Sequence, residues 1–213
     1  MPRHLDLRCS KLTMLPEAVG QLVILQELQL SENKLTTLPN SIGLLVHLEF
    51  LDVSMNMLTT LPQSFGQLQA LQTLILDKNQ GLQALPESIS QLTTLKHLSA
   101  KMVMLTTLPE SIDQLTALET LNLAGNQLTI LPESIGQLTA LIMLNLFSNQ
   151  LIALPDSFGQ LKNLQELLIA NNKLTTLPDT FEQRTALQFM SVTGNSELVI
   201  PELDMLPRLM IFL

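Results

Sequence analysis

Hydrophobic residues recur along the chain in one mixed pattern, which residues 131–153 show clearly. In the segment LPESIGQLTALIMLNLFSNQLIA, Leu144 and Leu146 alternate with polar or variable residues. That alternation is typical of a strand with one buried face. Upstream of it, Ile135 and Leu138 recur at helical spacing instead. The segment therefore predicts a short helical turn followed by a short strand.

A proline opens each helical turn. Pro132 fits the first turn of a helix, where its missing N–H is no loss, and Glu133 suits the positive end of the helix dipole. Other units carry an acid near the same place, and we interpret these residues as helix-start residues rather than as a binding site: Glu17, Glu87, Glu110, Asp156 and Asp179.

The whole chain repeats this unit. Leu-Pro pairs begin at Leu15, Leu38, Leu61, Leu85, Leu108, Leu131, Leu154 and Leu177, and Ile200-Pro201 adds a ninth beat. The intervals are 23 residues, except for one of 24 between Leu61 and Leu85. Nine strands are expected, centred near Leu5, Leu28, Leu51, Leu74, Leu98, Leu121, Leu144, Leu167 and Met190. No linker interrupts the array, so residues 1–213 are expected to form a single domain of about nine repeats.

Stacking decides the expected architecture, because no unit can bury its leucines alone. Parallel strands lie about 4.8 Å apart, whereas helices need about 8–10 Å. The strand side is the tighter one, so the stack must curve. The predicted fold is an α/β solenoid, with a parallel sheet on the concave side and short helices or 3₁₀ turns on the convex side.

At this point the sequence resembles the leucine-rich repeat family. The matching pattern is LPxSIGxLxxLxxLxLxxNxL, a 23-residue subclass found in intracellular Ras-group scaffolds and bacterial secreted effectors. The resemblance covers Leu5 to about Leu209, nearly the whole chain. It implies a curved horseshoe that binds other proteins, but the scaffold serves many partners.

An inward asparagine recurs in the repeats and is expected to satisfy turn N–H and C=O groups in neighbouring units. By resemblance this is the family's asparagine ladder: Asn33, Asn56, Asn79, Asn126, Asn149, Asn172 and Asn195. Ser10 and Val103 occupy the same position in the other two units.

The break at Val103 admits two interpretations, a binding role or a local repair. Ala100 replaces a bulky strand residue beside it, and an extra residue near Gly81 lengthens the preceding unit. We favour the repair, in which Val103 turns inward and refills the space lost at Ala100. This interpretation predicts that Val103→Asn does not stabilise the protein.

Apolar residues at outward strand positions are the candidate partner-binding residues. Most outward positions are polar or small. The main group of exceptions is Met143, Phe147, Leu168 and Phe189, and a second group is Phe50, Met55, Ile75 and Met102. Flexible methionine with occasional phenylalanine suits an adaptable protein-binding surface. The alternative is scattered exposed apolar residues, which are normal on soluble proteins. Met102 is expected to point to the concave side.

Composition narrows the function classes. A net charge of −8 argues against a nucleic-acid binder, which normally needs a basic stripe. The N-terminal half of the concave face is expected to mix acids with a few cations, which favours steering by complementary charge. Cys9 is the single cysteine, so no intrachain disulfide can form. No signal-peptide core, long apolar run or Asn-x-Ser/Thr acceptor occurs. We therefore expect an intracellular protein without membrane spans.

Catalytic and metal-binding constellations are not expected. His4 and His97 share a strand column but lie about 19 Å apart at the strand spacing, too far for one metal ion. Cys9 and His4 fall at opposite ends of one strand, although a nucleophile–base pair needs about 3 Å. An open sheet also provides no dry pocket to shift a pKa. The sequence thus predicts no enzyme, no cofactor, no metal and no small-molecule substrate.

The expected function is a non-enzymatic protein–protein interaction module that binds a partner on its concave sheet. It could serve as a bacterial effector or a signalling scaffold. One alternative is the substrate-recognition arm of a larger enzyme, such as a ubiquitin-ligase effector or a phosphatase complex, and another is a structural spacer. Neither end looks capped, and the chain stops at MIFL, where a further strand should form. We expect either a fragment or an array whose ends are covered by other segments.

Overall fold

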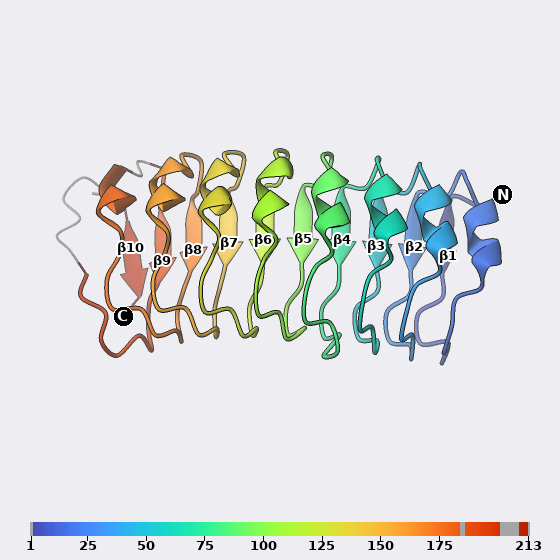
Figure 1. Cartoon of the computed structure of the whole chain (residues 1–213), viewed down its shortest axis with the longest axis horizontal. Helices are drawn as coiled ribbons and strands as arrows, with labels where there is room; N and C mark the ends of the chain where they lie inside the picture. Colours follow the sequence, from blue (N-terminus) through green and yellow to red (C-terminus); the bar gives the residue numbers. More distant parts are fainter. Residues whose placement is uncertain (1, 184–185, 201–208, 213) are drawn as a thin grey trace.

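The computed structural model describes residues 2–183, 186–200 and 209–212, and these form a curved solenoid (Figure 1). Ten strands make one parallel sheet in sequence order. They are β1 (His4–Asp6), β2 (Glu27–Gln29), β3 (Phe50–Asp52), β4 (Thr73–Ile75), β5 (His97–Ser99), β6 (Thr120–Asn122), β7 (Met143–Asn145), β8 (Glu166–Leu168), β9 (Phe189–Ser191) and β10 (Met210–Phe212). The nine predicted strands are confirmed, and β10 lies where the MIFL segment suggested a further one. Pro201, of the ninth beat, lies outside the described residues.

Eight 3₁₀ helices of five residues alternate with the strands and line the opposite side of the molecule. They are η1 (Glu17–Gln21), η2 (Asn40–Leu44), η3 (Gln63–Gln67), η4 (Glu87–Gln91), η5 (Glu110–Gln114), η6 (Glu133–Gln137), η7 (Asp156–Gln160) and η8 (Asp179–Gln183). A strand and the segment that follows it, up to the next strand, are called one repeat below, and the repeat carries the number of the strand. The six acids expected at helix starts each occupy the first helical residue.

The prolines lie one residue earlier than the sequence suggested. Pro132 has an extended backbone, with φ −67° and ψ 150°, and precedes η6. Its carbonyl accepts the N–H of Ile135 at 3.1 Å, the first i to i+3 bond of the helix. No side chain caps this end. Because a 3₁₀ turn starts at the carbonyl before it, proline contributes a fixed φ and an acceptor here rather than the first helical residue.

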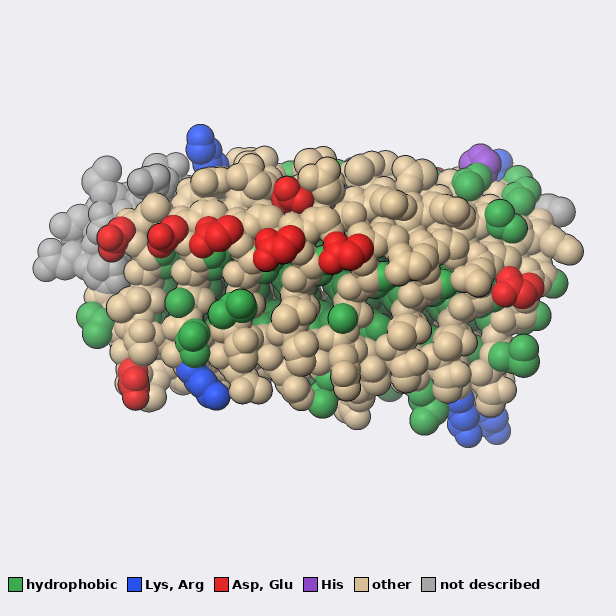
Figure 2. Space-filling view, viewed as in Figure 1, with side chains coloured by type: hydrophobic (Ala, Val, Ile, Leu, Met, Phe, Trp, Pro, Cys, Tyr) green, Lys and Arg blue, Asp and Glu red, His purple; other side chains and the backbone are tan. Residues whose placement is uncertain are grey.

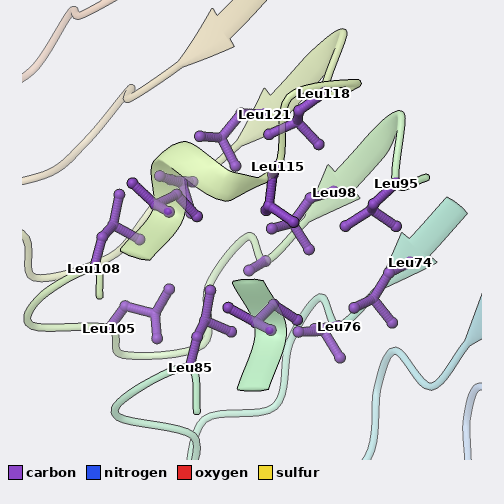
Figure 3. Packing of buried hydrophobic residues seen from close by; sticks show 14 of the residues in the cluster. Leu74, Leu76, Leu85, Leu95, Leu98, Leu105, Leu108, Leu115, Leu118 and Leu121 are labelled. Atoms are coloured by element: carbon purple, nitrogen blue, oxygen red, sulfur yellow. The ribbon is translucent and has the colours of Figure 1, made fainter. Parts of the chain in front are cut away.

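The core consists of leucine layers that join each repeat to the next. Strand centres pair in register, so that Leu121 lies beside Leu98 on one side and Leu144 on the other. These three leucines are at most 1% exposed. Figure 3 shows leucines of the strands, the turns and the helical side converging in the same interior space. Burial therefore depends on neighbours, as the repeat pattern predicted.

The asparagine ladder is confirmed, and Asn149 shows its geometry. Its Oδ1 accepts the N–H of Leu128 in the preceding repeat at 3.1 Å. Its Nδ2 donates to the carbonyls of Leu123 and Leu146 at 2.9 and 3.1 Å. All seven ladder asparagines are at most 9% exposed. Each one accepts a hydrogen bond from a backbone N–H that would otherwise be buried without an acceptor.

The interrupted rung at Val103 is compensated inside the preceding repeat. Val103 and Ala100 are both fully buried, as the repair interpretation requires. The N–H that an asparagine at this position would accept belongs to Leu82. That N–H donates instead to the carbonyl of Asn79 at 3.0 Å, across the turn that contains the extra residue. The lengthened turn therefore supplies the acceptor that Val103 cannot.

The same turn recurs at the end of the array. In repeat 9 the N–H of Leu198 donates to the carbonyl of Asn195 at 3.1 Å. In both places two residues, rather than one, separate the ladder asparagine from the next inward leucine. The extra residue is thus a defined turn that this scaffold uses twice.

Candidate functional site

The concave face consists of two columns of side chains that flank the buried centre of each strand. Their members follow from the strand register. The first column is His4, Glu27, Phe50, Thr73, His97, Thr120, Met143, Glu166, Phe189 and Met210. The second is Asp6, Gln29, Asp52, Ile75, Ser99, Asn122, Asn145, Leu168, Ser191 and Phe212. Backbone bonds between repeats continue past the strands, for example from Gly125 N to Phe147 O at 2.8 Å. A third outward residue per repeat therefore borders the face.

Apolar side chains recur on the last four strands of this face and next to them. The main predicted group lies on β7, β8 and β9 or, for Phe147, two residues beyond β7, and β10 adds two residues. We call the set the C-terminal concave patch: Met143, Phe147, Leu168, Phe189, Met210 and Phe212. Phe189 pairs in register with Met210, and the rings of Phe189 and Phe212 lie 5.0 Å apart at 33°. These contacts join Phe189, Met210 and Phe212. Met143 and Leu168 lie on neighbouring strands in different columns, so polar residues stand beside each of them.

The members of this patch differ in how far their side chains are exposed. Phe147 is 43% exposed, Met210 is 59% and Phe212 is 54%, whereas Met143, Leu168 and Phe189 are half-buried. The backbone N–H of Phe147 donates to Oδ1 of Asn145 at 3.0 Å, which fixes the local chain direction. The patch thus combines a partly packed base with projecting phenylalanine and methionine side chains.

Met210 and Phe212 were missed because the last repeat is shorter. Ile211 pairs with Met190, and their numbers differ by 21 rather than by 23 or 24. The signal was nevertheless present in the alternation of Met210, Ile211 and Phe212, which points the first and third side chains outward.

The second predicted group is dispersed. Phe50 and Ile75 are half-buried on adjacent strands but in different columns. Met55 and Met102 lie beyond the strand ends, two repeats apart, with Lys78 at the same position between them. All three residues have a left-handed backbone, with φ between 54° and 59°. The alternation from which Met102 was expected to point to the concave side therefore does not extend to this residue, and its orientation stays a prediction.

Met102 has a packing role at its actual position. A Cβ added at Gly125 would lie only 2.9 Å from Cγ of Met102. The methionine therefore occupies space that glycine leaves open in the next repeat. Gly125 itself has φ 69°, a conformation that glycine adopts at no steric cost.

Several polar side chains of the concave face already accept hydrogen bonds from the protein's own backbone. Oδ1 of Asp52 accepts the N–H of Ser54 at 2.8 Å, and Asn122 and Asn145 make the same bond two residues on. Asp77 accepts the N–H of Lys101 at 2.8 Å. These contacts explain part of the mixed polar face without a ligand.

An ion pair anchors the first repeat. Asp6 receives three hydrogen bonds from the Arg8 guanidinium and one from the Arg8 N–H, at 2.7 to 3.2 Å. These bonds lower the pKa of Asp6 from its usual 3.8 to about 2. Beside it, Nδ1 of His4 lies 2.8 Å from Oε2 of Glu27. The hydrogen bonds from Gln29 and His4 lower the pKa of Glu27.

The geometry offers no assembled catalytic or metal site in the described part of the chain. His4 and His97 occupy the same column four strands apart, as expected. Loss of hydration and the Glu32 carboxylate raise the pKa of the Cys9 thiol, which disfavours the reactive thiolate. The residues described include no cluster of three His, Cys, Asp or Glu side chains that could hold a metal ion. They also include no helix long and apolar enough to cross a membrane.

Sequence comparison identifies the repeats. The leucine-rich repeat region family matches residues 40–127, the leucine-rich repeat family matches residues 3–58 and 104–151, and a further leucine-rich repeat family matches residues 163–183. With the fold described above, these matches show that the chain belongs to the leucine-rich repeat proteins. A search of the curated proteins found no match.

Solved structures with similar folds include receptors with bound peptides or proteins. The leucine-rich repeat ectodomain of the Arabidopsis thaliana membrane receptor kinase GASSHO1/SCHENGEN3, in complex with CASPARIAN STRIP INTEGRITY FACTOR 2, is 26% identical. Its TM-score is 0.69, and the match covers 94% of this chain and 31% of that one. The plant peptide hormone receptor RGFR1, in complex with RGF2, is 26% identical with a TM-score of 0.65, covering 98% and 44%.

A bacterial structure shares the fold at lower identity. The functional domain of InlJ from Listeria monocytogenes is 23% identical with a TM-score of 0.76, and the match covers 99% of this chain and 44% of that one. This chain thus spans less than half the length of these three neighbours. Family and fold neighbours together support a protein-interaction module.

Proposed function

We propose that this chain is a non-enzymatic module that binds a segment of a partner protein on the C-terminal half of its concave sheet. The observation that carries the proposal is the recurrence of apolar outward side chains on four consecutive strands, with Phe189 beside Met210 and Phe212. Phe147 lies two residues beyond β7, and the leucines that build the fold are buried. Clustered phenylalanine and methionine side chains are the residue types that dominate many binding surfaces.

The surroundings of the patch suggest how a partner is oriented. Glu166 lies between Met143 and Phe189 in the first column and is exposed. Neither ion pair found among the described residues includes it. A lysine or arginine of the partner could pair with Glu166 while apolar side chains cover the flanking residues. Such rim charges contribute more to orientation and association rate than to affinity.

The comparisons bear on the coarser part of this proposal. The GASSHO1 and RGFR1 structures are of receptors in complex with their ligands, which supports a protein partner for this fold. An intracellular signalling scaffold or a bacterial effector remains our more specific proposal. It rests on the single cysteine and on the similarity to such repeats.

An alternative keeps the binding role but places the module in a larger enzyme. The observation that favours it is that the GASSHO1 domain is the ectodomain of a receptor kinase. In that case the concave patch would select a substrate or ligand for chemistry performed elsewhere.

Substitution of the patch tests the proposed function. Phe147→Asp with Phe189→Asp places two charges at the centre of the patch, so binding should weaken by about 2 kcal/mol or more, roughly 30-fold. The measurement is co-purification of the partner with tagged protein, followed by titration of that partner. The matched control is Thr120→Asp with Asn122→Asp on the same face, which should leave binding within about threefold of wild type. Equal retention of the partner by the patch variant, with an unchanged circular dichroism spectrum, would refute the proposal.

A further inference from the structure

A row of acids runs along the helical side of the molecule. The first helical residues of five successive repeats are acidic: Glu87, Glu110, Glu133, Asp156 and Asp179. Figure 2 shows acidic side chains in one line on this face, with no Lys or Arg side chain interrupting the line. Both ion pairs found among the described residues lie in β1 and β2 or next to them, away from this row.

Two of the five acids, Glu87 and Glu133, already contribute to the fold. Oε2 of Glu87 accepts the hydroxyl of Ser111 at 2.6 Å, and Oε2 of Glu133 accepts the N–H of Ser157 at 3.1 Å. These bonds join one helix to the next. They occupy one oxygen of each carboxylate and leave the other for a ligand.

An apolar furrow runs directly beneath this row. Figure 2 shows hydrophobic atoms recessed below the acids along the length of this face. Leu61 and Leu85, the leucines of two Leu-Pro pairs, line a hollow at one end of the row, and we infer the same place for the leucines of the later pairs. Leu85, Leu108, Leu131, Leu154 and Leu177 are 5 to 7% exposed. The inward leucines of the strands are at most 1% exposed, from Leu28 in β2 to Leu167 in β8. The furrow therefore reaches the edge of the core.

The residues beside the floor are exposed and mostly lack charge. Three positions before each acid stand Ala84, Thr107, Ile130, Ala153 and Thr176, all exposed. Ile130 is 57% exposed, and Ile152, in the next repeat, is 56% exposed. Most other repeats carry threonine at these two positions. Two exposed isoleucines in adjacent repeats give the furrow an apolar wall that the fold does not require.

The furrow opens into a hollow at one end of the acidic row. The hollow has a volume of about 400 Å³ and is lined by Thr60, Leu61, Ala84, Leu85 and Pro86, among others. Gly81, the extra residue of repeat 4, also borders it. Pro86, which lines the hollow, directly precedes Glu87, the first acid of the row.

We propose that this furrow is a second docking surface, distinct from the concave patch, for a basic and apolar segment of another protein. Charge complementarity identifies the occupant, because the row offers carboxylates that take part in neither described ion pair, above an apolar furrow. Helices of neighbouring repeats lie about 8–10 Å apart. In an extended polyproline-type segment, every third residue recurs after about 9 Å. Lysine or arginine at every third position would therefore meet one acid per repeat while the intervening apolar side chains face the floor.

A peptide probe tests this surface directly. The probe is a fluorescein-labelled peptide of the repeated triplet Lys-Leu-Pro, and the control peptide repeats Glu-Leu-Pro. Fluorescence anisotropy at low salt should show that the lysine peptide binds and that the glutamate peptide does not. The combined variant Glu110→Gln, Glu133→Gln and Asp156→Asn should weaken binding by roughly tenfold. Ile130→Thr with Ile152→Thr, which leaves the charge unchanged, should weaken it by roughly fivefold.

Matched variants distinguish the furrow from bulk charge and from the concave patch. Glu32→Gln, Glu49→Gln and Glu119→Gln remove the same charge elsewhere and should change binding by less than about twofold. Phe147→Asp with Phe189→Asp should also leave probe binding unchanged, so this test is independent of the proposed function. Equal loss in the two acid variants, loss in the phenylalanine variant, unchanged binding in the isoleucine variant, or equal binding of both peptides would overturn the proposal.

Discussion

A single asparagine in each repeat supplies hydrogen bonds that the turn backbone cannot make by itself. At Asn149 the dependence is unequal. The carbonyls of Leu123 and Leu146 each receive a second donor, from Asn126 and Asn172 respectively. Within the described part of the chain, the N–H of Leu128 has Asn149 Oδ1 as its one acceptor. Loss of the side chain should therefore matter mainly through one buried donor.

The ladder predicts different outcomes at two equivalent positions: removing the asparagine at one should destabilise the protein, and adding one at the other should not stabilise it. Asn149→Ala should lower the free energy of unfolding by about 1–3 kcal/mol, because Leu128 N–H loses its acceptor. Val103→Asn should give no gain, because Leu82 N–H already donates to Asn79. Urea denaturation of both variants measures the difference. A clear rise in melting temperature for Val103→Asn would contradict the compensation described for repeat 4.

The sequence was sufficient to predict the ladder but not this compensation. The recurring asparagine is visible as a letter at a fixed phase. The acceptor for Leu82 is a backbone carbonyl, whose direction depends on the conformation of one inserted residue. Left-handed turn residues such as Met102 escaped prediction for the same reason, because backbone conformation rather than residue type places them.

Protonation of Asp6 provides a test in the acid range. Its folded pKa of about 2 is below the usual 3.8, so the ion pair contributes stability above the usual pKa and loses it as the pH falls through the folded pKa. Carboxyl-carbon NMR titration should give a midpoint near 2 for wild type. In Arg8→Gln the midpoint should move toward 3.8, whereas Lys11→Gln, a charge-matched control, should leave it in place. An unchanged midpoint in Arg8→Gln would show that Arg8 does not hold the carboxylate.

Short helices and short strands share the work of stacking at the element scale. Strand positions were predictable because period-two alternation around a buried leucine is unambiguous over many copies. The choice between α-helix and 3₁₀-helix was left open in the sequence. Five residues are too few to distinguish the two helical periods in the sequence. In the structure, the proline carbonyl accepts the i+3 N–H that begins a 3₁₀ helix.

Close packing of the helices explains why most of them contain glycine at the fourth position. A Cβ added at Gly136 would collide with the Ser157 carbonyl oxygen and lie 2.7 Å from the Ser157 Cβ. Helices η4 and η5 instead carry Ser90 and Asp113 there. The helical side is therefore not uniform along the array.

Alanine substitution at two equivalent positions tests this packing. Gly136→Ala should destabilise the protein by about 1–3 kcal/mol, because the next repeat must shift to admit a methyl group. Ser90→Ala should change stability by only about 0.5 kcal/mol, because η4 already accommodates a Cβ there. Thermal denaturation compares them. Equal destabilisation in the two variants would mean that helix contact does not select glycine.

At the scale of the whole molecule, stability is shared between neighbours, and function occupies what stacking leaves free. The outward columns of the strands were assigned correctly from alternation. The rule does not apply beyond the end of a strand, where Met55 and Met102 lie. It also did not reach Met210 and Phe212, because the last repeat is shorter. Alternation is therefore informative within the strands and not at the repeat boundaries.

Position in the stack should set the cost of losing a core leucine. Leu121 is fully buried between two repeats, and Leu121→Ala should cost about 2–5 kcal/mol. Leu5 is half-buried on the first strand, so Leu5→Ala should cost about 1 kcal/mol. Urea titration with matched slopes gives both values. Similar losses at both sites would contradict nearest-neighbour stacking.

The lengthened turn of repeat 4 makes one corner of this molecule depend on a fixed number of residues. Leu74 still pairs with Leu98 although 24 residues separate them, so the added residue did not disturb the sheet. The N–H of Leu82 keeps its acceptor only while Asn79 stays three residues before it. A longer insertion between residues 80 and 81 would therefore remove that acceptor, and Val103 has no side-chain oxygen to replace it.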